Sequence, residues 1–355
     1  MTSPAGSSVE FHAARLWSST GRDRVICALC AHRCEIEPGK YGICGVRKNR
    51  AGKLVTLAYG EVVAASPDPI EKKPFFHFFP GTKSFSIATV GCNFRCGFCQ
   101  NWRISQRVQE ASPFREGRPL SPEAIVRLAR NAGCRSISYT YTEPTIFFEY
   151  ALDTAILARA AGMTNTFVTN GFMTAEALKV IRPFLDAANV DLKAFSDETY
   201  QKICGGRLQP VLDSIALMKK MGIWVEVTTL IVPGFNDDDA EISEIARFLA
   251  GLDRNIPWHI SRFHPDYEFA SVPATPLDTL ARAADVGRRK GLHFIYTGNI
   301  SGETEPTVCP NCRTKLIRRR GFEVIENLLV NDRCPRCNDV LPGVFIASSA
   351  MPIPL

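Results

Sequence analysis

The stretch SFSIATVGCNFRCGFCQNW, residues 84–102, joins an apolar run to three closely spaced cysteines. Cys92, Cys96 and Cys99 follow the pattern C-x3-C-x2-C, and the next cysteine along the chain is Cys134. Structural zinc sites close with four ligands, and ordinary iron–sulfur clusters also take four thiolates. The polar, glycine-bearing loop between the cysteines argues against three thiols simply buried in an apolar core. Three ligands therefore predict a metal centre with one open position, where metal-ion catalysis takes place.

The chain around this loop alternates short apolar runs with amphipathic stretches from residue 84 to 297. About seven β/α units predict an α/β fold, with a parallel sheet that closes into a partial or full TIM-like barrel. In such barrels the active site lies at the carboxyl ends of the strands, and the cysteine loop directly follows the first strand. We expect strands at 84–90, 135–141, 164–170, 187–195, 223–232, 257–263 and 293–298, and helices at 121–133, 145–162, 174–185, 208–222, 238–252 and 276–291.

Composition limits the class of protein. The chain has 355 residues, 45% hydrophobic and 22% charged, which is typical of globular proteins. The net charge of +6 comes from scattered basic residues, which is poor evidence for nucleic-acid binding. The N-terminus has no signal-peptide pattern, and no apolar run approaches the ~20 residues that span a bilayer. We therefore expect a cytoplasmic protein without membrane contact, whose thirteen cysteines serve mainly as metal ligands rather than disulfides. Cys134 and Cys204 stand alone in the sequence, and for these two we expect a structural role.

Two flanks depart from the β/α rhythm, so we expect an N-terminal extension at 1–83, a barrel at 84–298 and a C-terminal ribbon at 299–355. Residues 53–65 are expected to form a hairpin. The C-terminal pattern CPNC-x21-CPRC has the paired knuckles of a zinc ribbon and favours zinc over an auxiliary iron–sulfur cluster. The N-terminal pattern C-x2-C-x3-C-x9-C leaves zinc and an auxiliary cluster equally open. The flanking cysteines are Cys27, Cys30, Cys34 and Cys44, then Cys309, Cys312, Cys334 and Cys337.

The three-cysteine loop at the end of a barrel's first strand resembles the radical S-adenosylmethionine (SAM) superfamily. This resemblance implies that Cys92, Cys96 and Cys99 bind three irons of a [4Fe–4S] cluster. The fourth iron would be chelated by the amino and carboxylate groups of SAM, which accounts for the missing fourth thiolate. A reduced cluster would then cleave SAM to a 5′-deoxyadenosyl radical, which abstracts hydrogen from a substrate.

Further runs narrow the resemblance within the superfamily. YTEPT (141–145), VTNGF (168–172), VDLKAF (190–195) and LIVPGFND (230–237) resemble enzymes that activate glycyl-radical enzymes. With CALCAHRCEIEPGKYGICGVRKN (27–49), DPIEKKPFFHFFPGT (68–82) and HISRFHPDY (259–267), about residues 24–345 resemble the radical SAM member of the AmmeMemoRadiSam system. That family occurs beside AMMECR-like and Memo-like proteins, which are implied partners. A low-potential electron donor of the flavodoxin or ferredoxin type is also implied.

The resemblance carries roles to individual residues. The family's two glycines before its glutamate are Tyr141 and Thr142 here, while the glutamate itself is kept as Glu143. Asp191 and Lys193 alternate along one strand, so their side chains share a face. The implied SAM-binding residues are Phe98 against the adenine, Glu143 at the methionine amino group, Thr169 and Asn170 at the next strand end, and Asp191 with Lys193 near the methionine carboxylate.

The substrate side of the site is predicted with less guidance. Glu226, Arg262 and His264 are charged or titratable residues on the later strands, and we expect them to line it. Two readings compete with hydrogen abstraction from an unidentified substrate. One is activation of a glycyl-radical enzyme, which has a protein substrate. The other is a zinc-ribbon adaptor without catalysis, which explains the flanks and leaves the open three-cysteine site without a purpose.

Overall fold

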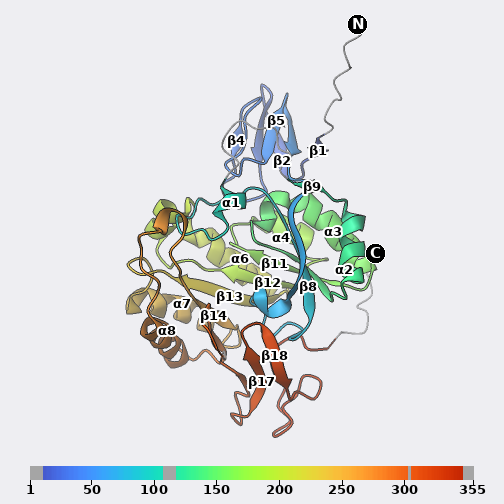
Figure 1. Cartoon of the computed structure of the whole chain (residues 1–355). Coiled ribbons are helices and arrows are strands. Elements are labelled where there is room, and N and C mark those ends of the chain that lie inside the picture. Colours follow the sequence, from blue (N-terminus) through green and yellow to red (C-terminus); the bar gives the residue numbers. More distant parts are fainter. Residues whose placement is uncertain (1–10, 107–116, 303–304, 347–355) are drawn as a thin grey trace.

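A nine-stranded sheet forms the centre of the molecule in the computed structural model, which describes residues 11–106, 117–302 and 305–346 (Figure 1). Its order is β15-β14-β13-β12-β11-β10-β8-β7-β9. The run from β15 to β8 is parallel, and β7 is antiparallel to both of its neighbours, β8 and β9. The strands are β7 (Glu61–Pro69), β8 (Lys83–Thr89), β9 (Arg118–Pro119), β10 (Ser136–Tyr139), β11 (Thr164–Thr169), β12 (Ala187–Asp191), β13 (Trp224–Ile231), β14 (Trp258–Arg262) and β15 (Ile295–Gly298). Because β15 and β9 end the order as separate edges, the described strands form a partial barrel.

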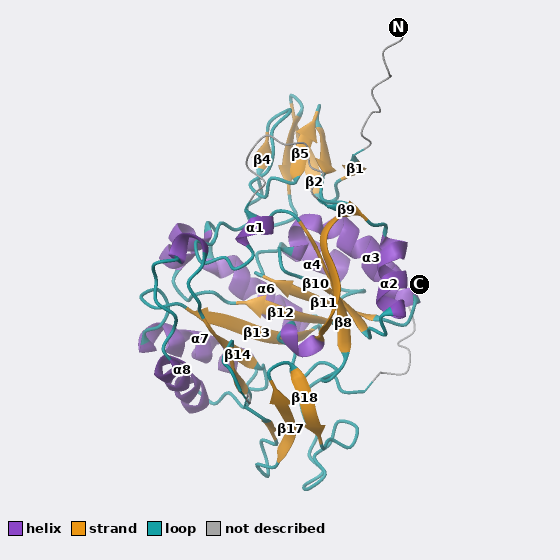
Figure 2. Ribbon diagram, viewed as in Figure 1, coloured by secondary structure: helices purple, strands orange, loops and turns teal. Residues whose placement is uncertain are grey.

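Helices cover the outer face of the sheet (Figure 2). Each predicted strand and helix of the barrel is confirmed, and the helix ends follow the local signals. Ser121, for example, accepts a hydrogen bond from the backbone N–H of Ala124, and Pro122 occupies the first turn of its helix. The helices are α1 (Trp102–Ser105), α2 (Pro122–Asn131), α3 (Phe148–Ala160), α4 (Ala175–Ile181), α5 (Asp197–Thr199), α6 (Leu208–Lys220), α7 (Asp239–Leu252) and α8 (Leu277–Arg289).

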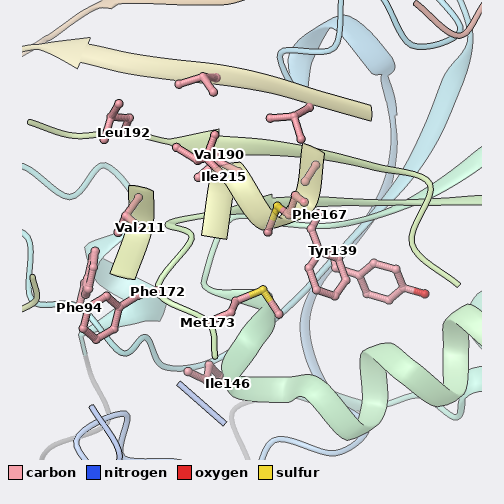
Figure 3. Packing of buried hydrophobic residues seen from close by; sticks show 14 of the residues in the cluster. Phe94, Tyr139, Ile146, Phe167, Phe172, Met173, Val190, Leu192, Val211 and Ile215 are labelled. Carbon is pink, nitrogen blue, oxygen red and sulfur yellow. The ribbon is translucent and has the colours of Figure 1, made fainter. Parts of the chain in front are cut away.

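The hydrophobic core is continuous from the sheet to these helices (Figure 3). Phe167 on β11 and Val190 on β12 are fully buried, as are Val211 and Ile215 on α6. Phe94 of the cysteine loop is also buried and packs on Phe172, with ring centroids 5.1 Å apart. The loop that follows β8 is therefore anchored in the core.

The N-terminal region contributes two small three-stranded sheets, β1-β6-β5 and β2-β3-β4. The prediction of a hairpin at residues 53–65 is wrong. Strand β6 pairs with β5 and β1, whereas β7 joins the central sheet beside β8 and β9. Apolar alternation predicts strands but does not specify their partners. The strands of this region are β1 (His12–Ala13), β2 (Trp17–Gly21), β3 (Arg24–Cys27), β4 (Glu35–Ile36), β5 (Arg47–Arg50) and β6 (Lys53–Thr56).

Residues 70–79, which follow β7, fill the inside of the partial barrel. The segment begins with the short 3-10 helix η1 (Ile70–Lys72), and its phenylalanines at 75, 76, 78 and 79 are buried. The carbonyl oxygen of Pro74 accepts a hydrogen bond of 2.8 Å from Nδ2 of Asn189 on β12. We call residues 70–79 the plug. It closes the inner space below the carboxyl ends of the strands.

A three-stranded antiparallel ribbon follows the barrel, with β16 (Thr307–Val308), β17 (Lys315–Arg320) and β18 (Glu323–Asn327). Arg319 joins the ribbon to the plug. Its buried guanidinium donates to the carbonyl oxygen of Phe76 at 2.7 Å and to Oγ1 of Thr307 at 2.9 Å. Among the described residues, no helix combines the length and apolar character needed to cross a membrane.

Candidate functional site

A cavity of about 300 Å³ opens at the carboxyl ends of the parallel strands, above the plug. Such an edge is where parallel α/β sheets carry ligand sites. The chain brings together here all the residues for which the sequence predicts cluster or SAM binding. They are Cys92, Cys96, Phe98, Cys99, Glu143, Thr169, Asn170, Asp191 and Lys193.

Glu143 is the buried carboxylate of this cavity. Its Oε1 accepts hydrogen bonds from the backbone N–H of Thr145 at 3.0 Å and from Oγ1 of Thr169 at 2.7 Å. Its Oε2 accepts the backbone N–H of Asn170 at 2.8 Å. Burial raises the pKa of Glu143 despite these donors. Each carboxylate oxygen offers two lone pairs, so Oε2 can accept a further donor, such as a ligand ammonium.

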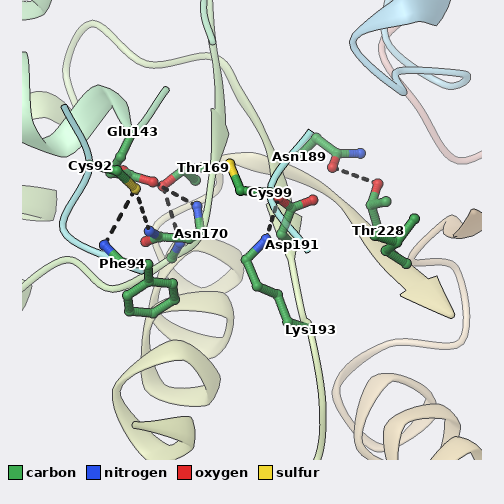
Figure 4. A network of polar contacts seen from close by, with 12 residues as sticks. Cys92, Phe94, Cys99, Glu143, Thr169, Asn170, Asn189, Asp191, Lys193 and Thr228 are labelled. Atoms are coloured by element: carbon green, nitrogen blue, oxygen red, sulfur yellow. Dashed lines mark hydrogen bonds and ion pairs between the residues drawn. The ribbon is translucent and has the colours of Figure 1, made fainter. Parts of the chain in front are cut away.

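Asn170 connects this carboxylate to the cysteine loop (Figure 4). Its Nδ2 donates to Oδ1 of Asn93 at 2.7 Å and lies 3.9 Å from Sγ of Cys92. The next residue of the loop, Phe94, points its backbone N–H at the same sulfur, 3.4 Å away. These contacts fix where Cys92 presents its thiol.

Lys193 and Asp191 form an ion pair at the end of β12, with Nζ 2.9 Å from Oδ2 (Figure 4). Burial alone would lower the pKa of Lys193, but Asp191 and the neighbouring thiols raise it well above its usual value. The ammonium also lies 5.9 Å from the ring centroid of Phe98. A permanent cation and an aromatic face therefore border the three cysteines.

The three cysteines suit a cluster better than a single metal ion. Within the described part of the chain, Cys309, Cys312, Cys334 and Cys337 alone have ligand atoms all within 4.8 Å of one another. The sulfurs of the loop are not grouped this closely. A cluster does not require such close grouping, because each ligand binds a different iron. Burial raises the pKa of Cys92 and Cys99, and the thiolate is the form in which a cysteine binds a metal.

Comparison with known proteins agrees with this geometry. Residues 86–249 match the radical SAM superfamily. The chain belongs to that superfamily. An uncharacterized protein of Methanocaldococcus jannaschii is 45% identical over 327 residues, covering 91% of this chain and 96% of the relative. The benzylsuccinate synthase activating enzyme of Thauera aromatica is 23% identical over 218 residues, or 52% of this chain and 62% of that enzyme.

Solved structures agree at the level of the fold. The crystal structure of a radical SAM methyltransferase from Sphaerobacter thermophilus has a TM-score of 0.50 at 18% identity, covering 63% of this chain and 68% of that one. Radical SAM enzymes use SAM and a [4Fe–4S] cluster and take electrons from a reductant. The superfamily match therefore supports a radical SAM enzyme.

The residues predicted for the substrate side do not come together. Glu226 is fully buried below the cavity, where it accepts backbone N–H groups of Phe76 and His77 and lies 2.7 Å from Nε2 of His259. Nε of Arg262 donates a hydrogen bond of 2.7 Å to the carbonyl oxygen of Thr275, and His264 is exposed. Strand alternation gives the face of Glu226 correctly, but the plug covers that level of the barrel.

Cys204 is a buried residue for which the sequence suggests only a structural role. Its thiol contacts that of Cys96, and this contact together with burial raises the pKa of Cys96 well above its usual value. The carbonyl oxygen of Cys204 also accepts the backbone N–H of Arg95 at 2.7 Å. No spacing pattern links positions 96 and 204, so the sequence carried no signal for this contact.

The two flanking cysteine sets differ in compactness. In the ribbon, Sγ of Cys309 lies 3.6 Å from that of Cys337, and Sγ of Cys312 lies 3.5 Å from that of Cys334. The N-terminal set lines a small separate cavity. Within the described residues, its sulfurs do not all lie within 4.8 Å of one another. The N-terminal region contacts the cysteine loop through His32, whose Nε2 lies 2.8 Å from the carbonyl oxygen of Asn93.

Sequence reasoning missed part of the cavity. Lys72 and Lys73 of the plug, together with Tyr141, line it. The unusual run DPIEKKPFFHFFPGT was a visible signal, because two adjacent lysines stand between aspartate and a cluster of phenylalanines. Its lack of helical or strand periodicity left its position in the fold open.

Proposed function

We propose that this protein binds a [4Fe–4S] cluster through Cys92, Cys96 and Cys99 and uses it to cleave SAM reductively, so that hydrogen is abstracted from a bound substrate. The observation that carries the proposal is one cavity lined by three cysteines, a buried carboxylate and a partly buried ammonium. When bound, the reduced cluster supplies one electron to SAM, which splits into methionine and the 5′-deoxyadenosyl radical.

The chain's own residues bind and orient SAM. Oε2 of Glu143 accepts the methionine ammonium, while Thr169 and the backbone of Asn170 keep the carboxylate in place. Lys193 pairs with the methionine carboxylate, and its contact with Asp191 orients the ammonium. Phe98 offers a flat apolar surface for the adenine. These groups act in a largely buried site, where charge-assisted hydrogen bonds are strong.

The flanking cysteines are proposed to hold further metal centres outside the barrel at 84–298. A zinc ion with Zn–S bonds of about 2.3 Å holds tetrahedral sulfurs about 3.8 Å apart. The 3.6 Å and 3.5 Å separations in the ribbon at 299–355 are close to this value and support zinc there. The wider N-terminal set, within residues 1–83, fits an auxiliary iron–sulfur cluster better than one zinc ion.

Activation of a glycyl-radical enzyme is the second candidate function. It is supported by the similarity to the benzylsuccinate synthase activating enzyme, at 23% identity. Membership of the AmmeMemoRadiSam system is also part of the proposal, with AMMECR-like and Memo-like proteins as partners and a cytoplasmic location. A flavodoxin or ferredoxin would supply the electron.

Anaerobic reconstitution with iron and sulfide tests the main proposal. Dithionite-reduced protein should show the electron paramagnetic resonance signal of a [4Fe–4S]⁺ cluster, and this signal should change when SAM is added. The reduced protein should then form 5′-deoxyadenosine. A reconstituted protein that forms none would contradict the proposal. Mixing with a glycyl-radical enzyme and looking for a glycyl radical tests the second candidate.

A further inference from the structure

The plug presents two ammonium groups to the cavity beside a single carboxylate. Nζ of Lys72 lies 2.8 Å from Oδ1 of Asp68, and Nζ of Lys73 lies 2.9 Å from Oδ2 of the same residue. Burial alone would raise the pKa of Asp68, but hydrogen bonds from Lys72, Tyr141 and Lys73 keep it well below its usual value. The carboxylate is therefore ionised, and the trio of Asp68 and the two lysines carries one excess positive charge.

Tyr141 completes the group in a strained conformation. Its backbone φ is 64°, in the left-handed region, which is unfavourable for a residue other than glycine. Its hydroxyl donates to Oδ2 of Asp68 at 2.6 Å, and Nζ of Lys73 lies 4.0 Å from its ring centroid. Strained residues that are held by several contacts are concentrated at functional sites. The ring therefore covers one side of the Lys73 ammonium.

Other charges of the cavity do not compensate this excess. Lys193 is matched by Asp191, and Glu143 faces the cluster end, where the methionine ammonium of SAM is proposed to bind. The side chain of Lys73 is 2% exposed, and it shares the carboxylate of Asp68 with Lys72, so this buried charge is only partly compensated, which is costly. Each ammonium has three N–H donors, of which the contact with Asp68 uses one. An anionic ligand group would satisfy both the charge and the remaining donors.

We propose that Lys72, Lys73 and Tyr141 bind an anionic group of the substrate, a carboxylate or a phosphate, at the floor of the cavity. This inference rests on the proposed function, since it assumes that the cavity holds the molecule from which hydrogen is abstracted. It assigns a class of substrate: a small molecule with an acid group at the end that enters first. A glycine residue inside a protein chain has no such group, so the inference favours a small molecule over a glycyl-radical enzyme.

The test measures anion binding to the reconstituted protein in the presence of SAM, by calorimetry, with acetate and inorganic phosphate as probes. SAM is present so that its carboxylate occupies Lys193. Acetate or phosphate binding then reports on Lys72 and Lys73 of the plug. Lys73→Met should weaken binding by at least about tenfold, one decade of Kd. Lys72→Met, whose side chain is 42% exposed, should weaken it less and is compatible with folding.

Lys219→Met provides a matched control. Lys219 also pairs with an aspartate, Asp253, at 2.8 Å and lies 5.7 Å from the ring centroid of Trp224, outside the cavity. Its removal should leave anion binding unchanged. Preference for acetate identifies a carboxylate, and preference for phosphate identifies a phosphate; either result supports the site.

Two results would overturn the inference: no binding of either anion to the parent protein, or binding that Lys72→Met and Lys73→Met leave unchanged. If Lys73→Met does not fold, Lys72→Met alone decides. The proposed function is judged separately, by 5′-deoxyadenosine formation in the parent protein. Anion binding without SAM cleavage would contradict the proposed function and support the anion site. SAM cleavage without anion binding would support the proposed function and contradict the anion site.

Discussion

The side-chain amide of Asn170 donates a hydrogen bond to Oδ1 of Asn93 at 2.7 Å, and so joins the end of β11 to the cysteine loop after β8. The backbone N–H of the same Asn170 binds Oε2 of Glu143. One residue thus links the cysteine loop to the carboxylate proposed to hold SAM. Strand ends that are separated in sequence act as one site because such contacts fix them relative to each other.

Asn170→Ala should loosen the cysteine loop without removing a ligand. Loss of one hydrogen bond of about 1 kcal/mol corresponds to roughly fivefold in a rate or equilibrium. We therefore expect about fivefold faster loss of iron from the reconstituted protein to a chelator, followed by absorbance. Asn255→Ala is the control, since that side chain bonds His293 at 2.9 Å, away from the cavity. Equal rates in both variants would show that Asn170 does not support the loop.

Replacing Cys92, Cys96 or Cys99 by alanine should abolish SAM cleavage while the chain still folds. Each change removes one proposed iron ligand from a loop at the rim of the barrel and replaces it with a small apolar side chain, which the buried position of Cys96 also accepts. The measurements are 5′-deoxyadenosine formation and the circular dichroism spectrum. Cys134→Ala, a buried cysteine outside the cavity, should retain cleavage. Activity in any of the three variants would rule out the cluster assignment.

Glu143→Gln should weaken SAM binding by about ten- to a hundredfold, because a charge-assisted bond to the ammonium is worth roughly 1.5–3 kcal/mol. The cluster's absorbance without SAM should not change. Lys193→Met should act in the same way at the carboxylate. Parent-like affinity in both variants would show that these residues do not bind SAM.

Glu226→Gln is the control for Glu143→Gln, since both carboxylates are buried and accept several hydrogen bonds. Burial alone would raise the pKa of Glu226, but the hydrogen bond and charge of His259 lower it. The variant should therefore lose stability, measured as the free energy of unfolding, and bind SAM like the parent protein. A loss of SAM affinity here would mean that the plug does not separate Glu226 from the cavity.

Cys309→Ser and Cys334→Ser should lower the thermal stability of the protein, because a structural zinc contributes its binding free energy to folding. Metal analysis of a triple variant at Cys92, Cys96 and Cys99 should still find zinc. Iron and sulfide bound by the ribbon in place of zinc would contradict the assignment. The compact sulfurs, 3.5 Å and 3.6 Å apart in pairs, are the reason for this expectation.

Acetate binding should weaken as the pH rises from 7 to 9. Burial lowers the pKa of Lys73 to about 8, against the opposing effect of Asp68, so its ammonium is lost over this range. The groups facing it titrate elsewhere: the pKa of Asp68 is lowered, and those of Lys72 and Tyr141 are raised. Calorimetry at both pH values checks this. Lys73→Met should remove the dependence, and a parent protein that binds acetate equally at pH 7 and 9 would refute it.

The sequence by itself determined the order of β/α units and the three-cysteine loop at the first strand end. Both depend on local features: apolar periodicity, helix caps such as Ser121, and the spacing of Cys92, Cys96 and Cys99. The resemblance to a known superfamily also implied that Glu143 and Lys193 share a site with those cysteines, which agrees with the common edge at which parallel strands end. The paired knuckles of the ribbon follow from spacing in the same way.

Only the tertiary structure decided what occupies the inside of the barrel. Alternation along β13 gives the face on which Glu226 lies, but its depth depends on the plug, which enters from a distant part of the chain. The contact of Cys204 with Cys96 and the meeting of Lys73 with Tyr141 are likewise long-range. Such contacts follow from how aperiodic segments pack, and packing depends on the whole molecule rather than on any local pattern.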